Sequence, residues 1–243
     1  MGRHELKGAE LLPEEKKQLK CLGGQMLWVA SQTRPDLSFD TCAMTNISKT
    51  STTKAIHEAN KAIVKLKTDQ SIKIKFPSIE SIEGVKVVAF SDATYASLDD
   101  GSSHGGHIIF IEGRNKKVVP ISWQSKKLNR VTKSPLASET LELAEAGDTG
   151  FLVALMVQEI FQLLVPPTIE CITDNESLYE TLKTTTTLSD KRLRVDIARL
   201  RQMVERKEID VTWVEGNRQI ADCLTKKGAS SLRLLEVLKS SHL

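Results

Sequence analysis

The sequence has no long hydrophobic run, few aromatic residues and no closely spaced cysteines. Aromatic residues make up 5% of its 243 residues, and the cysteines are Cys21, Cys42, Cys171 and Cys223. The longest apolar stretch, residues 151–165, is interrupted by Gln158, Glu159 and Gln162 and falls short of the about 20 residues that a membrane-spanning helix needs. These absences predict no membrane segment, no cysteine metal site and reduced thiols in an intracellular protein.

Neither sign of charge dominates the composition. The chain has 34 Lys and Arg against 31 Asp and Glu, a formal net charge of +3, with 40% hydrophobic and 27% charged residues. This balance is typical of a globular protein and excludes collagen-like, low-complexity and broadly disordered chains. Cations gather at residues 114–133 and 191–207, where they form either solvated faces or contacts to phosphates.

The hydrophobic spacing predicts a small helical unit followed by an α/β sandwich. Helices are expected from Pro13 to Arg34 and over residues 37–47 and 53–67, before a linker that reaches Gly84. Five strands are then expected at residues 85–90, 107–111, 118–123, 168–173 and 209–214. Further helices are expected at residues 136–164, 176–183, 190–206 and 219–226. The short connectors between the first three strands predict an antiparallel meander.

Two carboxylates follow the predicted strands directly. Asp92 comes just after the first strand and Asp174 just after the fourth. If these strands are parallel neighbours, the two acids converge at the carboxyl edge of the sheet. The alternative for a single Asp here is an Asx turn or a helix cap, and Asp174 could cap the helix that begins near Glu176.

Two further acids, Glu139 and Asp222, lie on helices that should pack against this sheet. Asp222 is surrounded by apolar residues, and burying such an acid is costly unless it is paired or bound to a metal. Converging carboxylates without Cys or His favour hard cations such as Mg²⁺ over Zn²⁺. Two such ions, about 3.5–4 Å apart, could activate water and stabilise the leaving oxygen of an in-line phosphoryl displacement.

Histidine and tryptophan offer weaker signals. His104 and His107 are three residues apart, so in a strand they face opposite sides, which disfavours a shared metal. Trp123 and Trp213 stand at strand ends and are expected to be core aromatics, with stacking on nucleic acid as the lesser alternative.

Five short motifs occur in order along the second part of the chain. They are Ser91-Asp92-Ala93, Ser122-Trp123-Gln124-Ser125-Lys126-Lys127, Ala137-Ser138-Glu139 leading into Ala144-Glu145-Ala146, Thr173-Asp174-Asn175-Glu176-Ser177, and Gln219-Ile220-Ala221-Asp222-Cys223-Leu224-Thr225-Lys226. Together they resemble the RNase H domain of copia-type LTR-retrotransposon Pol polyproteins, over about residues 85–227. The segment around Thr33-Arg34-Pro35-Asp36, with the helix at 53–67, is similar to the end of the reverse transcriptase (thumb/connection) in those polyproteins.

The resemblance implies an RNase H-like α/β fold, with a mixed five-stranded sheet flanked by helices and preceded by a small helical segment. The implied domains are a thumb/connection-like segment with linker at 1–84, an RNase H-like domain at 85–228, and a C-terminal helix or tail at 229–243. The implied partners are an RNA–DNA hybrid and the polymerase domain of the same polyprotein. The implied location is cytoplasmic, in a virus-like particle, or nuclear.

The implied function is an endoribonuclease that cleaves the RNA strand of RNA–DNA hybrids by two-metal-ion hydrolysis. By resemblance, the catalytic acids are Asp92, Glu139, Asp174 and Asp222. They would bind two Mg²⁺ ions, for which Mn²⁺ could substitute. Such an enzyme recognises the 2′-hydroxyl and the groove shape rather than a base sequence. The candidate nucleic-acid contacts are Ser125, Lys126, Lys127, Arg130, Lys133 and Asn175, the alternatives being a solvated loop for the cations and local backbone bonds for the other two.

The sequence departs from the family pattern near the helix acid. Thr140 and Leu141 follow Glu139 where the family usually has an Ala-Glu-Tyr run, and Glu142 shares its helix face. The register of residues 144–146 favours Glu139. In the cationic helix Asp196 is retained and is expected to be a structural ion-pair partner. The alternative function is a catalytically silent module that binds hybrid or assembles with a polymerase, but the presence of all four acids favours the enzyme.

Overall fold

The computed structural model describes residues 9–47, 52–79, 81–184 and 188–243, and it divides the chain into two compact units. The first unit is Met1–Lys73 and the second is Ile74–Leu243. Within the described ranges, no helix combines the length and the apolar character needed to cross a bilayer.

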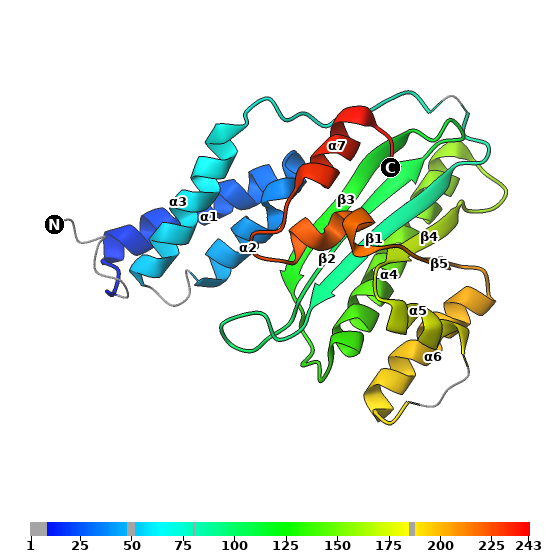
Figure 1. Cartoon of the computed structure of the whole chain (residues 1–243). Helices are drawn as coiled ribbons and strands as arrows, with labels where there is room; N and C mark the ends of the chain where they lie inside the picture. Colours follow the sequence, from blue (N-terminus) through cyan, green and yellow to red (C-terminus); the bar gives the residue numbers. More distant parts are fainter. Residues whose placement is uncertain (1–8, 48–51, 80, 185–187) are drawn as a thin grey trace. The chain divides into compact units, whose positions relative to one another are not determined.

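The first unit is helical, as predicted. It contains α1 (Pro13–Gln32), the short 3₁₀ helix η2 (Pro35–Leu37), α2 (Ser38–Ile47) and α3 (Thr53–Thr68) (Figure 1). Pro13 occupies the first turn of α1, and the Glu15 carboxylate accepts a hydrogen bond from the Leu12 backbone N–H at 2.7 Å. The three helices bury one small core, which includes Leu19, Met26, Leu37, Met44, Ala55 and Ala59.

The second unit is built on a mixed five-stranded sheet, which confirms the predicted fold class. Its strands are β1 (Lys86–Thr94), β2 (His104–Glu112), β3 (Val118–Lys127), β4 (Thr168–Thr173) and β5 (Asp210–Trp213), in the order β3-β2-β1-β4-β5. The first three strands form an antiparallel meander. β4 pairs in parallel with both β1 and β5, so the first and fourth strands are parallel neighbours.

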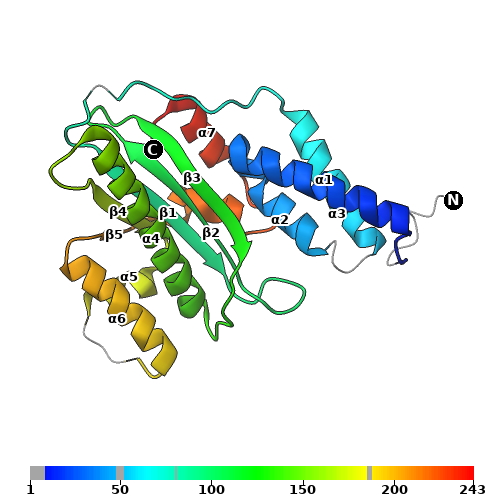
Figure 2. The same cartoon turned by 180° about the vertical axis from the view of Figure 1, so that it is seen from behind.

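Helices cover both faces of this sheet (Figures 1 and 2). One face carries α4 (Pro135–Phe161), with α5 (Glu176–Lys183) and α6 (Lys191–Glu205), and the other carries the 3₁₀ helix η5 (Ile220–Leu224) and α7 (Leu232–Ser240). Successive side chains of β1 point to opposite faces of the sheet and so contribute to the hydrophobic core on each face. Val87 and Ala89 pack towards α4, whereas Val88 and Phe90 pack towards η5. Asp92 continues the second series.

Several elements differ from the sequence prediction, including β2, which begins at His104, and β3, which continues to Lys127. β1 continues beyond Phe90 to Thr94 because β2 still pairs with it there, so Asp92 lies inside a strand, opposite Gly106, rather than past its end. The predicted closing helix is the 3₁₀ helix η5, which begins at Ile220. α4 ends at Phe161 rather than at residue 164, because Gln162 adopts a left-handed conformation.

Candidate metal centre

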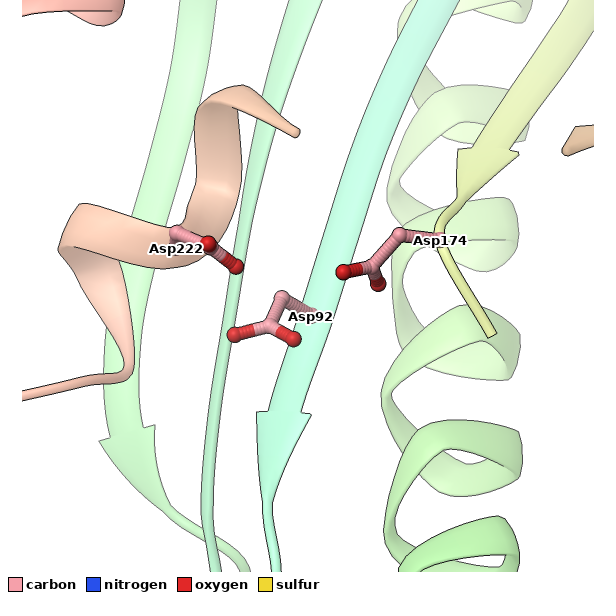
Figure 3. A group of neighbouring side chains, drawn as sticks. All are labelled: Asp92, Asp174 and Asp222. Atoms are coloured by element: carbon pink, nitrogen blue, oxygen red, sulfur yellow. The ribbon is translucent and has the colours of Figure 1, made fainter. Parts of the chain in front are cut away.

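Three aspartates meet beside the carboxyl end of the parallel pair β1 and β4. The pairing of these strands ends at Phe90 and Ile172, and two residues further on lie Asp92 and Asp174. Asp222 reaches the same place from η5 (Figure 3). One carboxylate oxygen from each aspartate lies within 4.8 Å of the others. The convergence that the strand ends predicted is therefore present, with Asp222 as the third member.

Close packing of η5 on β2 positions Asp222. Gly106 lies beneath η5, where a Cβ atom would stand 2.7 Å from Leu224 Cβ and 3.1 Å from the Leu224 carbonyl oxygen. Gln219 caps η5 by accepting from the Ala221 N–H, and its side-chain amide donates to the Ser91 carbonyl at 2.9 Å. Because Gly106 has no side chain, η5 can approach the strands closely, and the hydrogen bonds of Gln219 hold it there.

Glu139, the fourth predicted acid, is not among the carboxylates whose oxygens lie within 4.8 Å of one another, but it interacts electrostatically with Asp92 and Asp174. It lies near the start of α4, is 7% exposed, and its carboxylate accepts from the Ala93 backbone N–H. Its Oε2 atom is buried and has no hydrogen-bond partner in the described part of the chain. Burial, reinforced by the charges of Asp92 and Asp174, raises the pKa of Glu139 well above its usual value. A buried carboxylate oxygen without a partner, next to other carboxylates, fits a cation.

Lys226 joins the acids, and the sequence analysis did not predict this. Its Nζ atom lies 2.5 Å from Asp222 Oδ1 and 3.3 Å from Asp92 Oδ1. The Thr225 hydroxyl donates to the other oxygen of Asp92. Burial raises the pKa of Asp92 to about 6 and also raises that of Asp222, while the Lys226 ammonium opposes both shifts. The four-residue spacing from Asp222 was the one sequence signal for this contact.

Glu142, the alternative to Glu139, has a different partner. Its Oε1 atom hydrogen-bonds His107 Nδ1 at 2.7 Å, and both side chains are buried between α4 and β2. His104 instead contacts Ser125 at 2.8 Å, on the η5 side of the sheet. The two histidines thus face opposite sides of β2, as predicted.

The predicted nucleic-acid contacts have different local partners. Ser125 donates to the Leu224 carbonyl at 2.7 Å, and Asn175 caps α5 by accepting from the Leu178 N–H at 2.9 Å. Because Asn175 provides the cap, Asp174 does not, which leaves the Asp174 carboxylate to the acid cluster.

Several of the predicted cations form ion pairs with acids from different parts of the chain. Lys126 pairs with Glu145, and Lys127 pairs with Asp100. Arg130 makes a bidentate pair with Asp196 at 2.8 and 3.0 Å, which confirms Asp196 as a structural partner. Arg130, Lys133 and Arg192 line a shallow cleft between the β3–α4 connection and the start of α6.

The two tryptophans differ in their environment. Trp123 packs against the core on the η5 side, as expected. Trp213 is 38% exposed and donates its indole N–H to the Asp174 carbonyl at 3.0 Å, so its assignment to the core was wrong. β5 is an edge strand, and this leaves Trp213 beside the metal-centre acids instead of beneath a covering layer.

The sheet order and the acid cluster together define an α/β protein with a mixed five-stranded sheet and a candidate divalent-metal centre. No family model matches the chain. It is similar to two retrovirus-related Pol polyproteins of Arabidopsis thaliana, from transposon RE2 (31% identical) and transposon RE1 (30%), each over 141 residues and 57% of this chain. These relatives confirm the resemblance that the motifs indicated. The matched part is 9% of each relative's length.

The chain is also similar to solved RNase H structures at low identity. LC11-RNase H1 from compost has a TM-score of 0.43 and 13% identity, covering 58% of this chain and 92% of that one. RNase H1 from Halobacterium salinarum has a TM-score of 0.41 and 18% identity, covering 58% and 94%. The prototype foamy virus protease-reverse transcriptase has a TM-score of 0.36 and 11% identity, covering 89% and 31%.

Proposed function

We propose that this chain carries an endoribonuclease that cleaves the RNA strand of RNA–DNA hybrids, as part of a retrotransposon Pol polyprotein. The observation that carries the proposal is the convergence of Asp92, Asp174 and Asp222 beside the buried, unpartnered Oε2 atom of Glu139. The similarity to Pol polyproteins supports its place in such a polyprotein. A polymerase domain of that polyprotein is the proposed protein partner.

The cluster is proposed to hold two divalent cations. All four side chains offer carboxylate oxygens, which suit Mg²⁺, with Mn²⁺ as a substitute. Asp92, Glu139, Asp174 and Asp222 would hold the ions, and Asp92 would be central because it interacts electrostatically with each of the other three acids. When bound, the ions would supply the charge that activates water and stabilises the leaving oxygen of the phosphodiester.

The chain's own residues then orient the site and the hybrid. The Thr225 hydroxyl fixes one oxygen of Asp92, and Ser125 holds η5 through the Leu224 carbonyl. Arg130 and Lys133, at the cleft beside α6, are the proposed contacts to a phosphate of the hybrid. Lys126 and Lys127 are proposed to add positive charge near the same face, which favours binding without base specificity.

Cleavage of an end-labelled RNA–DNA hybrid by the purified chain tests this function. We expect cuts in the RNA strand with Mg²⁺, none with EDTA, and none in double-stranded RNA. Asp174→Asn should lower the rate by more than about a hundredfold, since it removes a ligand and not merely a residue that supports one. Asp210→Asn, the same change at an exposed acid on β5, is the matched control and should cut normally.

Two results would contradict the proposal. Equal cutting by the Asp174→Asn variant would mean that this acid cluster is not the active site. A folded chain that binds hybrid but cuts none in Mg²⁺ or Mn²⁺ would assign it to the alternative, a catalytically silent binding module.

A further inference from the structure

The ammonium group of Lys226 lies against one side of the acid cluster. It contacts Asp222 Oδ1 at 2.5 Å and Asp92 Oδ1 at 3.3 Å. Both oxygens belong to the carboxylates that would hold a divalent ion between Asp92 and Asp222. A divalent ion on this side of Asp92 must therefore share those oxygens with the lysine or displace it.

The opposite side of Asp92 has no such cation within the described residues. Glu139 Oε2 lacks a partner there, and Asp174 forms no ion pair in that part of the chain. Within the described residues, Lys226 acts electrostatically on Glu139 and Asp174 without forming an ion pair with either, whereas it contacts Asp92 and Asp222 directly. The cluster is thus electrostatically asymmetric about Asp92.

We propose that Lys226 is a built-in competitor for one of two ion positions, an inference that rests on the metal-dependent function proposed above. An ion enters first on the side of Asp92, Glu139 and Asp174. The position between Asp92 and Asp222 fills only when the Lys226 ammonium moves away. Lys226 therefore sets the order and the relative affinity of the two ions, and acts as a positioning residue.

The side chain of Lys226 is suited to such a movement. It is 39% exposed, and its ammonium is a point charge on a flexible four-carbon stem. A phosphate of a bound hybrid offers the displaced ammonium a new anionic partner. Substrate binding and occupation of the second ion position would then favour each other.

Mn²⁺ binding to the whole chain, without nucleic acid, tests this proposal. Isothermal titration and the electron spin resonance signal of free Mn²⁺ would give the number and the affinity of bound ions. For the unaltered protein we expect one ion and a second that binds at least about tenfold more weakly. Lys226→Gln removes the charge yet keeps an N–H donor for Asp222, and should tighten the second ion about tenfold or more.

Matched variants separate charge from packing. Lys227→Gln makes the same change at the next residue, whose side chain is exposed, and should leave both affinities unchanged. Lys226→Arg keeps the positive charge and should bind Mn²⁺ as the unaltered protein does. Thermal unfolding in EDTA provides a second readout, because Lys226→Gln leaves the acids less compensated and should gain more stability from added Mn²⁺ than the unaltered protein gains.

The outcomes distinguish this inference from the proposed function. If Mn²⁺ binds and Asp174→Asn abolishes binding, but Lys226→Gln leaves both affinities unchanged or weaker, the competitor role is wrong and the metal centre stands. If no variant binds Mn²⁺ at millimolar concentration, the metal-dependent function and the role of Lys226 are both overturned.

Discussion

Asp92→Asn should stabilise the folded protein in EDTA, although it should abolish hybrid cleavage. The pKa of Asp92 rises from 3.8 to about 6 on folding, chiefly through burial. A rise of about two pH units corresponds to ~3 kcal/mol, at roughly 1.36 kcal/mol per unit. An asparagine has no charge to bury, and its side-chain carbonyl can still accept from the Thr225 hydroxyl.

The sign of the effect depends on pH. Because folding raises the pKa of Asp92, the folded state binds the proton more tightly than the unfolded chain does. The free energy that this tighter proton binding contributes to folding is fully present below pH 3.8, and it is lost as the pH rises through about 6. The variant should therefore match the original protein at about pH 3.5 and exceed its free energy of unfolding by up to ~3 kcal/mol at about pH 8.

Urea unfolding in EDTA across this pH range, followed by tryptophan fluorescence, measures the difference. Asp210→Asn, at an exposed position, should show no comparable pH-dependent gain. An Asp92→Asn variant that is less stable than the original protein at about pH 8 would refute the reasoning. Lys226 and Thr225 would then compensate the buried charge fully.

Four further substitutions test separate parts of the structure. Gly106→Ala should cost about 1–3 kcal/mol in urea unfolding and slow cleavage, because the new Cβ pushes η5 and Asp222 from the sheet. Arg130→Met should change the free energy of unfolding by under about 1 kcal/mol but weaken hybrid binding. Titrations at several ionic strengths should show that the slope of log binding constant against log salt concentration falls by about 1. Glu142→Gln should lower the free energy of unfolding by roughly 1–3 kcal/mol, because it weakens the buried bond to His107, yet it should retain Mn²⁺ binding. Glu139→Gln should lose Mn²⁺ binding in the same titration.

Local signals in the sequence predicted the elements beside Asp174 well. β4 and α5 have the expected bounds, since two prolines precede the apolar strand and Asn175 provides the cap that begins the helix. Apolar runs also indicated the first and fourth strands, whereas their parallel pairing was only a condition for the two acids to converge, and the structure shows that pairing.

Non-local contacts explain what the sequence did not predict. Ser91 to Thr94 are mostly polar and carry no strand signal, yet they remain extended because β2 continues beside them. The short η5 forms where Gly106 allows it to approach the sheet. Neither effect is visible in a window of neighbouring residues.

The acid cluster was predictable in part. Strand ends and the family resemblance pointed to Asp92, Glu139, Asp174 and Asp222, but spacing alone left Glu139 and Glu142 as alternatives. Glu142 hydrogen-bonds His107, a buried residue of β2, and this tertiary contact distinguishes Glu142 from Glu139. The contact of Lys226 with Asp92 likewise arises from the tertiary fold, as does the neighbouring bond from Thr225, which joins residues 133 positions apart.

The dispersal of the acids over four elements also has a temporal consequence. During synthesis, β1, α4 and β4 leave the ribosome before η5, so a growing chain presents three acids while the fourth is still missing. The proposed nuclease activity would therefore appear late, after Asp222 has emerged and η5 has docked over Gly106. A premature stop before Asp222 would yield a polypeptide that carries most of the sheet but cannot cut the hybrids around it.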